Sequence, residues 1–208
     1  MKNFLIICIV ILLLTSVSGC VVSSDFLYRT MTDLRELSED IQEINRLVGA
    51  EDFSGALLAM DVLNVRFDKI NVAIAEAEQM GEDPAIISKI KSVSVFTGAL
   101  FDYMRQTLKT GQDVYDGNAL LASMPERNKE KAVATIDYID TFAENVKELD
   151  RFYERLADAE TKLSDDDSKN LGADAAVEAF NEIQAKYDPL AENLLKEKSA
   201  LKGLYGLE

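Results

Sequence analysis

Histidine and tryptophan are absent from this chain of 208 residues, and only three prolines, ten glycines and two cysteines are present. The absence of histidine excludes Ser-His-Asp and Cys-His catalytic systems, zinc sites of the HExxH type and the Glu-x-x-His ligand pairs of di-iron bundles. The sequence also contains neither a P-loop nor a GxGxxG motif. We therefore expect a protein that is not an enzyme and that uses no cofactor.

The scarcity of proline and glycine favours long helices with few connections, because these two residues are the main interrupters of helices. Alanine, leucine, glutamate and lysine dominate after residue 25, and hydrophobic residues make up 48% of the chain. We predict an all-α fold, an elongated bundle of four to five mainly antiparallel helices with coiled-coil-like heptad seams. A single domain covers residues 26–202, and residues 203–208 form a frayed C-terminus.

Acidic residues outnumber basic ones, with 37 Asp and Glu against 22 Lys and Arg, which gives a formal net charge of −15. This balance argues against nucleic acid as a partner, because phosphate binding requires clustered basic side chains. It argues equally against electrostatic docking on anionic lipid. Two interpretations remain open: a solvated, self-repelling acidic surface, and an acidic patch that recognises a cationic partner.

Hydrophobic periodicity places the first three helices. One runs from Phe26 to Gly49, and a second begins after the N-cap Asp52 and stops at the segment MGEDP. The seam of the second helix repeats every three or four residues: Phe53, Ala56, Met60, Leu63, Phe67, Ile70, Ile74 and Ala77. Asp83 and Pro84 form the N-cap and first position of a third helix. Its segment VSVFTGALF is apolar nearly all round, which indicates burial in the middle of the bundle.

The second half of the chain predicts more interruptions. We expect a break near Gly111, a capping box formed by Ser123 and Glu126, and then a long helix that ends at about Leu163. The segment SDDDSKNLGAD predicts a loop. A last helix follows, which we expect to kink or break at Pro189, because proline lacks the backbone donor that a helix needs.

The first nineteen residues carry a single charge, Lys2. The apolar run FLIICIVILLL follows, and the small residues of TSVSG then precede Cys20. A positive start, an apolar centre and small residues before a cleavage point are the plan of a secretory signal peptide. A membrane-spanning helix fits less well, because small polar residues dilute the second half and no basic stop signal follows. Cys8 lies inside the apolar run, so the folded part has no disulfide framework.

The residues Val17, Ser18, Gly19 and Cys20 resemble the lipobox of prokaryotic membrane lipoproteins, bacterial or archaeal: an aliphatic residue, a small residue, Gly or Ala, and then Cys. The resemblance implies cleavage after Gly19 and lipid attachment at the Cys20 thiol, with a diacylglyceryl group supplying stable attachment. Residues 1–19 are then the signal peptide, and residues 20–25 are the lipidated cysteine and a short tether. An uncleaved N-terminal anchor and ordinary secretion are the alternatives.

Aromatic residues gather on the third and fourth predicted helices. Phe96, Gly98, Tyr103, Tyr138 and Phe142 are our candidate lining for an apolar pocket that would hold a lipid-like or aromatic ligand. The alternative is that the rings pack in the core, with the tyrosine hydroxyls at its edge.

Carboxylates are the remaining candidates for a metal site. Asp165, Asp167 and Asn170 would offer oxygen ligands to Ca²⁺. The spacing fails the EF-hand pattern, because Lys169 falls at a ligand position and Asn170 stands where glycine is required. A solvated acidic loop is therefore the preferred interpretation, and we expect no metal site.

These observations predict a lipid-anchored, extracytoplasmic helical-bundle protein of a cell membrane or envelope that acts as a binding or scaffold component without catalysis. Its expected partners are the membrane, through the lipid on Cys20, and another protein. Self-association through an exposed helical seam remains open. The alternative function is a ligand-binding lipoprotein, accessory to a transporter or sensor, with an apolar or aromatic ligand between its helices.

Overall fold

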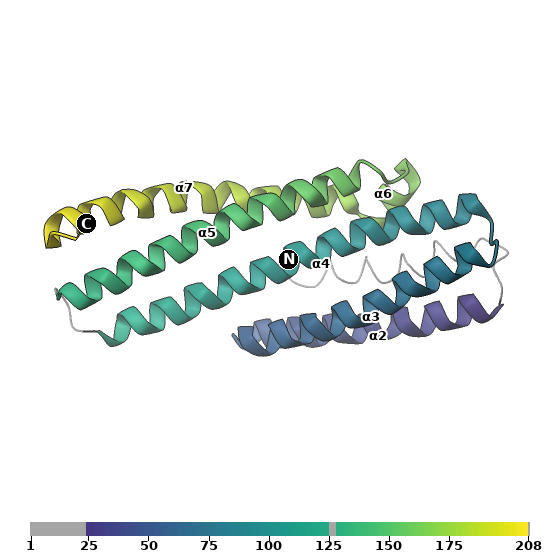
Figure 1. The fold of residues 1–208 in the computed structure, drawn as a ribbon, viewed down its shortest axis with the longest axis horizontal. Coiled ribbons are helices and arrows are strands. Elements are labelled where there is room, and N and C mark those ends of the chain that lie inside the picture. The colour runs from purple at the N-terminus through teal and green to yellow at the C-terminus, as the bar shows by residue number, and fades with distance from the viewer. Residues whose placement is uncertain (1–23, 125–127, 208) are drawn as a thin grey trace.

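The computed structural model describes residues 24–124 and 128–207. This part of the chain contains six α-helices and no strand, and Figure 1 shows them as a long bundle. The helices are α2 (Ser24–Gly49), α3 (Phe53–Gln79), α4 (Pro84–Ser123), α5 (Lys129–Glu160), α6 (Asp165–Leu171) and α7 (Ala173–Tyr205). The predicted all-α class and elongated bundle are confirmed, with the seven-residue α6 as the additional helix.

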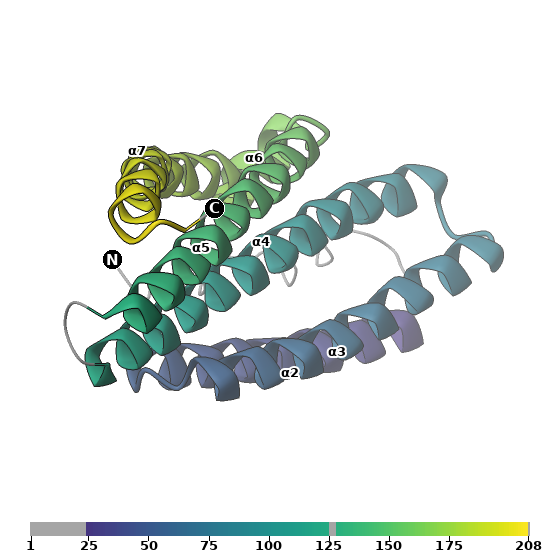
Figure 2. The ribbon, with the colours of Figure 1, turned by 60° about the vertical axis from the view of Figure 1, so that its left-hand side comes forward.

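The long helices form a row in which each packs against the next along the chain: α2 on α3, α3 on α4, α4 on α5, and α5 on α7. Successive long helices run in opposite directions, as expected for short connections (Figure 1). The hairpin of α2 and α3 lies on one side of α4, and α5 with α7 lies on the other, as the turned view in Figure 2 shows. α4 is therefore the central element.

α4 supplies side chains to two hydrophobic cores. Phe101 and Leu108 belong to the core shared with α2 and α3, whereas Phe96, Leu100 and Tyr103 belong to the core shared with α5 and α7. A helix that is covered on two sides must be apolar around most of its circumference. The burial predicted for the segment VSVFTGALF is thus confirmed for most of its residues, while Val95 stays exposed.

The sequence predicted the α3 seam and two helix starts correctly. Seven seam residues are buried: Ala56, Met60, Leu63, Phe67, Ile70, Ile74 and Ala77. Asp52 caps α3 by accepting a hydrogen bond from the backbone N–H of Gly55 at 2.9 Å. Asp83 caps α4 by accepting one from Ala85 at 2.8 Å, with Pro84 at the first helical position.

The predicted break near Gly111 is wrong, because α4 continues through Gly111 and Gly117 to Ser123. Both glycines serve close packing between helices. A Cβ at Gly111 would lie 2.9 Å from Cε1 of Phe53, and one at Gly117 would lie 2.2 Å from Cδ2 of Tyr138. The missing side chains therefore admit aromatic rings from α3 and α5 against the backbone of α4.

The predicted capping box at Ser123 is also wrong. Asn128 is the N-cap of α5 and accepts a hydrogen bond from the backbone N–H of Lys131 at 2.6 Å. The hydroxyl of Ser123 instead donates to the carbonyl of Leu120 at 2.6 Å. Glu126, the other half of the predicted motif, lies outside the described residues.

The acidic segment predicted as a loop forms α6. Ser164 caps the helix by accepting a hydrogen bond from the backbone N–H of Asp167, and three aspartates occupy its first turn, where the helix dipole favours negative charge. Gly172 has a φ of 57°, the left-handed conformation that ends α6 and turns the chain into α7. The Ser164 cap and the favourable position of the three aspartates at the N-terminus together explain why α6 is helical, although its composition favours a loop.

α7 is a single helix that contains Pro189, so the predicted break into two helices does not occur. Buried residues hold the helix to its neighbours on both sides of the proline, with Gln184 before it and Ala191 after it. The helix also continues past residue 202 to Tyr205, where Gly206 ends it with a φ of 62°.

Gly117→Ala is expected to lower the free energy of unfolding by about 1–3 kcal/mol, because the added methyl group overpacks the contact with Tyr138. Gly203→Ala is the matched control, since nothing lies within 4 Å of a Cβ added there. It should raise stability by up to about 1 kcal/mol through helix propensity. Urea denaturation followed by circular dichroism measures both variants, and equal stabilisation by the two would contradict the packing described.

Candidate functional site

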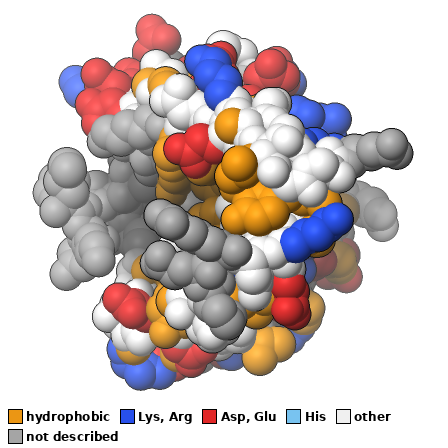
Figure 3. Space-filling model, turned by 90° about the vertical axis from the view of Figure 1, so that its left-hand side faces the viewer, with side chains coloured by type: hydrophobic (Ala, Val, Ile, Leu, Met, Phe, Trp, Pro, Cys, Tyr) orange, Lys and Arg blue, Asp and Glu red, His pale blue; other side chains and the backbone are white. Residues whose placement is uncertain are grey.

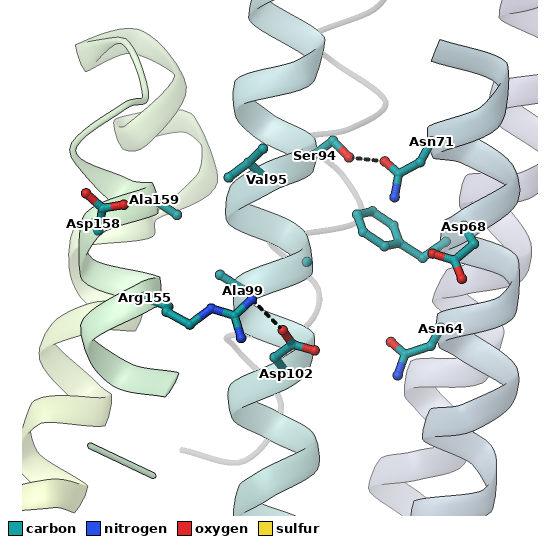
Figure 4. A pocket seen from close by; sticks show the side chains of 12 residues that line it. Asn64, Asp68, Asn71, Ser94, Val95, Ala99, Asp102, Arg155, Asp158 and Ala159 are labelled. Atoms are coloured by element: carbon teal, nitrogen blue, oxygen red, sulfur yellow. Dashed lines mark hydrogen bonds and ion pairs between the residues drawn. The ribbon is translucent and has the colours of Figure 1, made fainter. Parts of the chain in front are cut away.

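An open groove of about 670 Å³ crosses α4 between α3 and α5. Figure 4 shows side chains of all three helices around it. The polar residues of its lining are Asn64, Asp68 and Asn71 on α3, Ser94 and Asp102 on α4, and Arg155 and Asp158 on α5. The groove exists because α3 and α5 both pack on α4 and leave part of its surface uncovered.

Small residues and one ring form the floor of the groove. Gly98 and Ala99 line it from α4, and a Cβ added at Gly98 would lie only 3.2 Å from Cε1 of Phe67. The Phe67 ring also packs edge-on against Phe101, with ring centroids 5.3 Å apart. Glycine inside a helix costs about 1 kcal/mol relative to alanine. The close approach of the Phe67 ring accounts for its presence at position 98.

The walls of the groove carry more negative than positive charge. Asp68, Asp102 and Asp158 line it, with Arg155 as the one cation among its lining residues. Nη2 of Arg155 lies 3.1 Å from Oδ2 of Asp102, which ties α5 to α4. Asp158 pairs with Lys162 at 2.5 Å. Since Asp102 and Asp158 already have basic partners, Asp68 is the carboxylate that favours a cationic group in a ligand, and the neighbouring amides can hydrogen-bond its polar groups.

One hydrogen bond ties the groove wall on α3 to α4. The hydroxyl of Ser94 donates to Oδ1 of Asn71, as the dashed line in Figure 4 marks. Ser94 is buried, so this bond satisfies a polar group that would otherwise be costly inside the structure.

The structure separates the five residues predicted to line an apolar pocket. Phe96 and Tyr103 are buried in the core that α4 shares with α5 and α7. Phe142 lies in a different cluster, with its ring centroid 6.0 Å from that of Tyr187. Tyr138 packs over Gly117, and burial raises the pKa of its hydroxyl. Of the five, only Gly98 borders the groove.

Sequence reasoning missed the polar wall of the groove. Asn64, Asp68 and Asn71 are spaced four and three residues apart, so they form a polar stripe along one side of the α3 seam. This spacing was the available signal. The stripe lines a groove only because α4 and α5 pack beside α3. Which helices pack beside one another cannot be read from the sequence pattern alone.

Tyr103 is fully buried, and its ring centroid lies 4.3 Å from that of Phe180. Burial raises the pKa of the Tyr103 hydroxyl far above its ordinary value, because the charged form would lose its hydration. The hydroxyl oxygen has no hydrogen-bond partner among the described residues, and neither has Oε1 of the buried Gln184.

The predicted calcium ligands lie on α6. Asp165 and Asp167 are in its first turn, and Oδ1 of the buried Asp167 lies 3.0 Å from the ammonium group of Lys89. The side chain of Asn170 is outside the description. Among the described residues, no group of three or more His, Cys, Asp and Glu side chains is placed to hold a metal ion.

Two carboxylates share a serine where α5, α6 and α7 meet. The hydroxyl of Ser168 lies 2.7 Å from Oδ1 of Asp174 and 3.2 Å from Oε1 of Glu160. Burial raises the pKa of Glu160, and the hydrogen bond with Asp174 raises it further. The hydrogen bond from Ser168 lowers the pKa of Asp174. Glu160 is therefore the member of the pair that holds a proton longer.

The lipobox residues Val17, Ser18, Gly19 and Cys20 lie outside the described residues. Of the described helices, α4 alone is long and apolar enough to cross a membrane, judged by length and composition. A buried core helix meets the same criterion, and the two cores that α4 joins account for its apolar character.

No family model matches the chain, and neither a curated protein nor a solved structure matches it.

Tyr103→Phe is expected to raise the free energy of unfolding by up to about 1 kcal/mol, because it removes a buried hydroxyl that has no partner. Thermal and urea unfolding measure the effect, with Tyr115→Phe as a control at a more exposed ring. A loss of stability in the Tyr103 variant alone would contradict this packing and would indicate a molecule bound to the hydroxyl in the interior.

Glu160→Gln is expected to raise the melting temperature at pH 7 by about 1–2 °C, because the amide donates to Asp174 without carrying a charge. Since the pKa of Glu160 is raised in the fold, its ionisation destabilises the folded state above that pKa and has no effect well below it. The variant and the parent should therefore melt together near pH 3. Glu154→Gln, an exposed change on α5, is the control, and an equal gain at both pH values would contradict the assignment.

Proposed function

We propose that this protein is a lipid-anchored helical bundle on the extracytoplasmic face of a cell membrane or envelope, where it presents a binding or scaffold surface. The observation that carries the proposal is the sequence Val17-Ser18-Gly19-Cys20 directly before the folded part. α2, the first of the described helices, begins at Ser24, and three residues stand between Cys20 and Ser24 in the sequence. At about 3.5 Å per extended residue, such a tether would hold the bundle close to the bilayer.

Two features support binding without catalysis. The chain has no histidine, which removes the commonest general acid and base. Enzymes also enclose their reacting groups away from water, whereas the groove is open and its carboxylates at Asp68 and Asp158 are exposed. We therefore propose that this protein acts by binding other molecules and not by catalysis.

Figure 3 looks onto one end of the bundle, where hydrophobic side chains lie among acidic and basic ones. This end therefore offers both apolar and charged groups to a partner.

A ligand-binding lipoprotein, accessory to a transporter or sensor, is the second candidate function. The groove between α3 and α5 favours it, because amides and charges converge there on a floor of small residues. Its lining suits a small polar ligand with a cationic group better than the apolar or aromatic ligand that the sequence suggested. The ligand would then lie on the surface of α4 instead of between packed aromatic rings.

Cys20→Ala is expected to abolish incorporation of a radioactive lipid precursor when the full chain is expressed in a prokaryotic host. The uncleaved chain should also migrate above the parent on a gel, because residues 1–19 remain attached. Cys8→Ala is the matched control: Cys8 lies in the segment that is removed, so this variant should be labelled and processed like the parent. Equal labelling of the Cys20 variant and the parent would overturn the proposed anchor.

A further inference from the structure

Helix α3 carries a second apolar stripe on the side opposite its buried seam. Leu58, Val62, Val65 and Val72 are 69%, 48%, 60% and 58% exposed. With 3.6 residues per turn, these four side chains share one face of the helix. Single exposed aliphatic residues are normal, but a continuous stripe of them marks a contact surface. We call this set the outer stripe.

The outer stripe has the period of a coiled-coil seam. Leu58, Val65 and Val72 are seven residues apart, and Val62 and Lys69 occupy the alternate positions between them. Successive seam positions are thus separated by four, three, four and three residues. Such spacing fits one straight helix laid along α3, because each side chain then enters a gap between side chains of the partner.

We propose that the outer stripe binds a second copy of this chain, with the two α3 helices antiparallel and Val62 of each copy opposite Val65 of the other. In this register Leu58 covers the aliphatic part of Lys69 of the second copy. Val72 lies over Gly55 of the second copy, where no side chain occupies the seam. The centre of the contact is then four valines, two from each copy.

Charge selects the antiparallel arrangement. Parallel pairing would place Lys69 against Lys69 in the apolar seam, and like charges within a helical seam are destabilising. Antiparallel pairing brings Lys69 within about one helical turn of Asp61 of the other copy. Asp61 already lies 3.0 Å from Arg105. Each half of the contact therefore contains four charged side chains. Asp61 and Arg105 come from one copy, and Asp68 and Lys69 come from the other. Two acidic groups are thus balanced by two basic groups.

The same charges favour a second copy over a basic partner helix. A basic helix would suit the net charge of −15, but it would set its own cations against Lys69 in the middle of the seam. A second copy instead places Leu58 opposite Lys69 and brings Asp61 within about one helical turn of it. Repulsion between two acidic chains is long-range, and salt screens it beyond about 8 Å at physiological ionic strength.

The contact is small. Four aliphatic side chains from each copy bury less than the roughly 800 Å² per partner of a standard stable interface, so the dimer dissociates in dilute solution. Confinement of both copies to one membrane would raise their effective concentration and strengthen the pairing. The inference itself does not rest on the lipid anchor, because the stripe belongs to α3 and its charges belong to α3 and α4.

Disulfide formation between introduced cysteines tests the register. The full chain with Cys8→Ala and Cys20→Ala, purified in mild detergent, leaves only the introduced thiols to react. Leu58→Cys and Lys69→Cys versions of this chain, carrying tags of different size, are mixed at high concentration and oxidised. The mixed disulfide should form at least about tenfold faster than the disulfide of Leu58→Cys with itself, because contact raises the effective concentration of the two thiols.

Three controls make the outcome decisive. Leu204→Cys, on α7 and 75% exposed, reports the rate of random collision. Val65→Glu, added to both chains, should reduce the mixed disulfide to that rate, because it places a carboxylate in the apolar centre. Val133→Glu, on the exposed surface of α5, should leave it unchanged. Circular dichroism confirms that the Val65 variant folds.

Two results overturn the proposal. A Leu58→Cys disulfide that forms faster than the mixed one would indicate parallel pairing. A mixed disulfide no faster than the Leu204→Cys control would leave the outer stripe to a different partner.

Discussion

The position of α4 between two hydrophobic cores is the constraint on which the rest of this structure depends. Phe96, Leu100, Phe101 and Tyr103 are consecutive or nearly so along the chain, yet they point into different cores and are each at most 1% exposed. Burying side chains of this size contributes roughly 1.5–3 kcal/mol each. Because α4 is buried on two sides, it joins the α2–α3 hairpin and the α5–α7 pair, which lie on opposite sides of α4, into one folded unit.

Both proposed contact surfaces follow from this arrangement in a row. Because α3 and α5 lie on two sides of α4 instead of closing over it, Gly98 and Ala99 remain at the floor of an open groove. Because α3 packs inward on α2 and α4, its outward face is left uncovered, and Val62 and Val65 lie there in water. Surfaces of this kind suit a protein that acts by binding, which is the function proposed for it.

Residues whose role is set within their own helix were predictable from the sequence. The α3 seam from Ala56 to Ala77 and the Asp83–Pro84 start of α4 follow from helical period and local capping, and both are confirmed. Gly111 was misread as a break, because the Phe53 ring that needs the space comes from a distant part of the sequence. Gly117 lies in a segment that was correctly expected to be helical, but its contact with the Tyr138 ring could not be foreseen for the same reason. The groove shares this origin: its polar residues are visible in the sequence, but their convergence depends on the order in which helices pack.

Native-state hydrogen exchange tests most directly whether α4 unites the two cores. Amides of α4 between Val93 and Leu108 should exchange most slowly, with the free energy of global unfolding, and core amides of α3 and α5 should approach the same value. The account would be contradicted if the α2–α3 hairpin and the α5–α7 pair opened with two clearly different free energies and α4 followed only one of them.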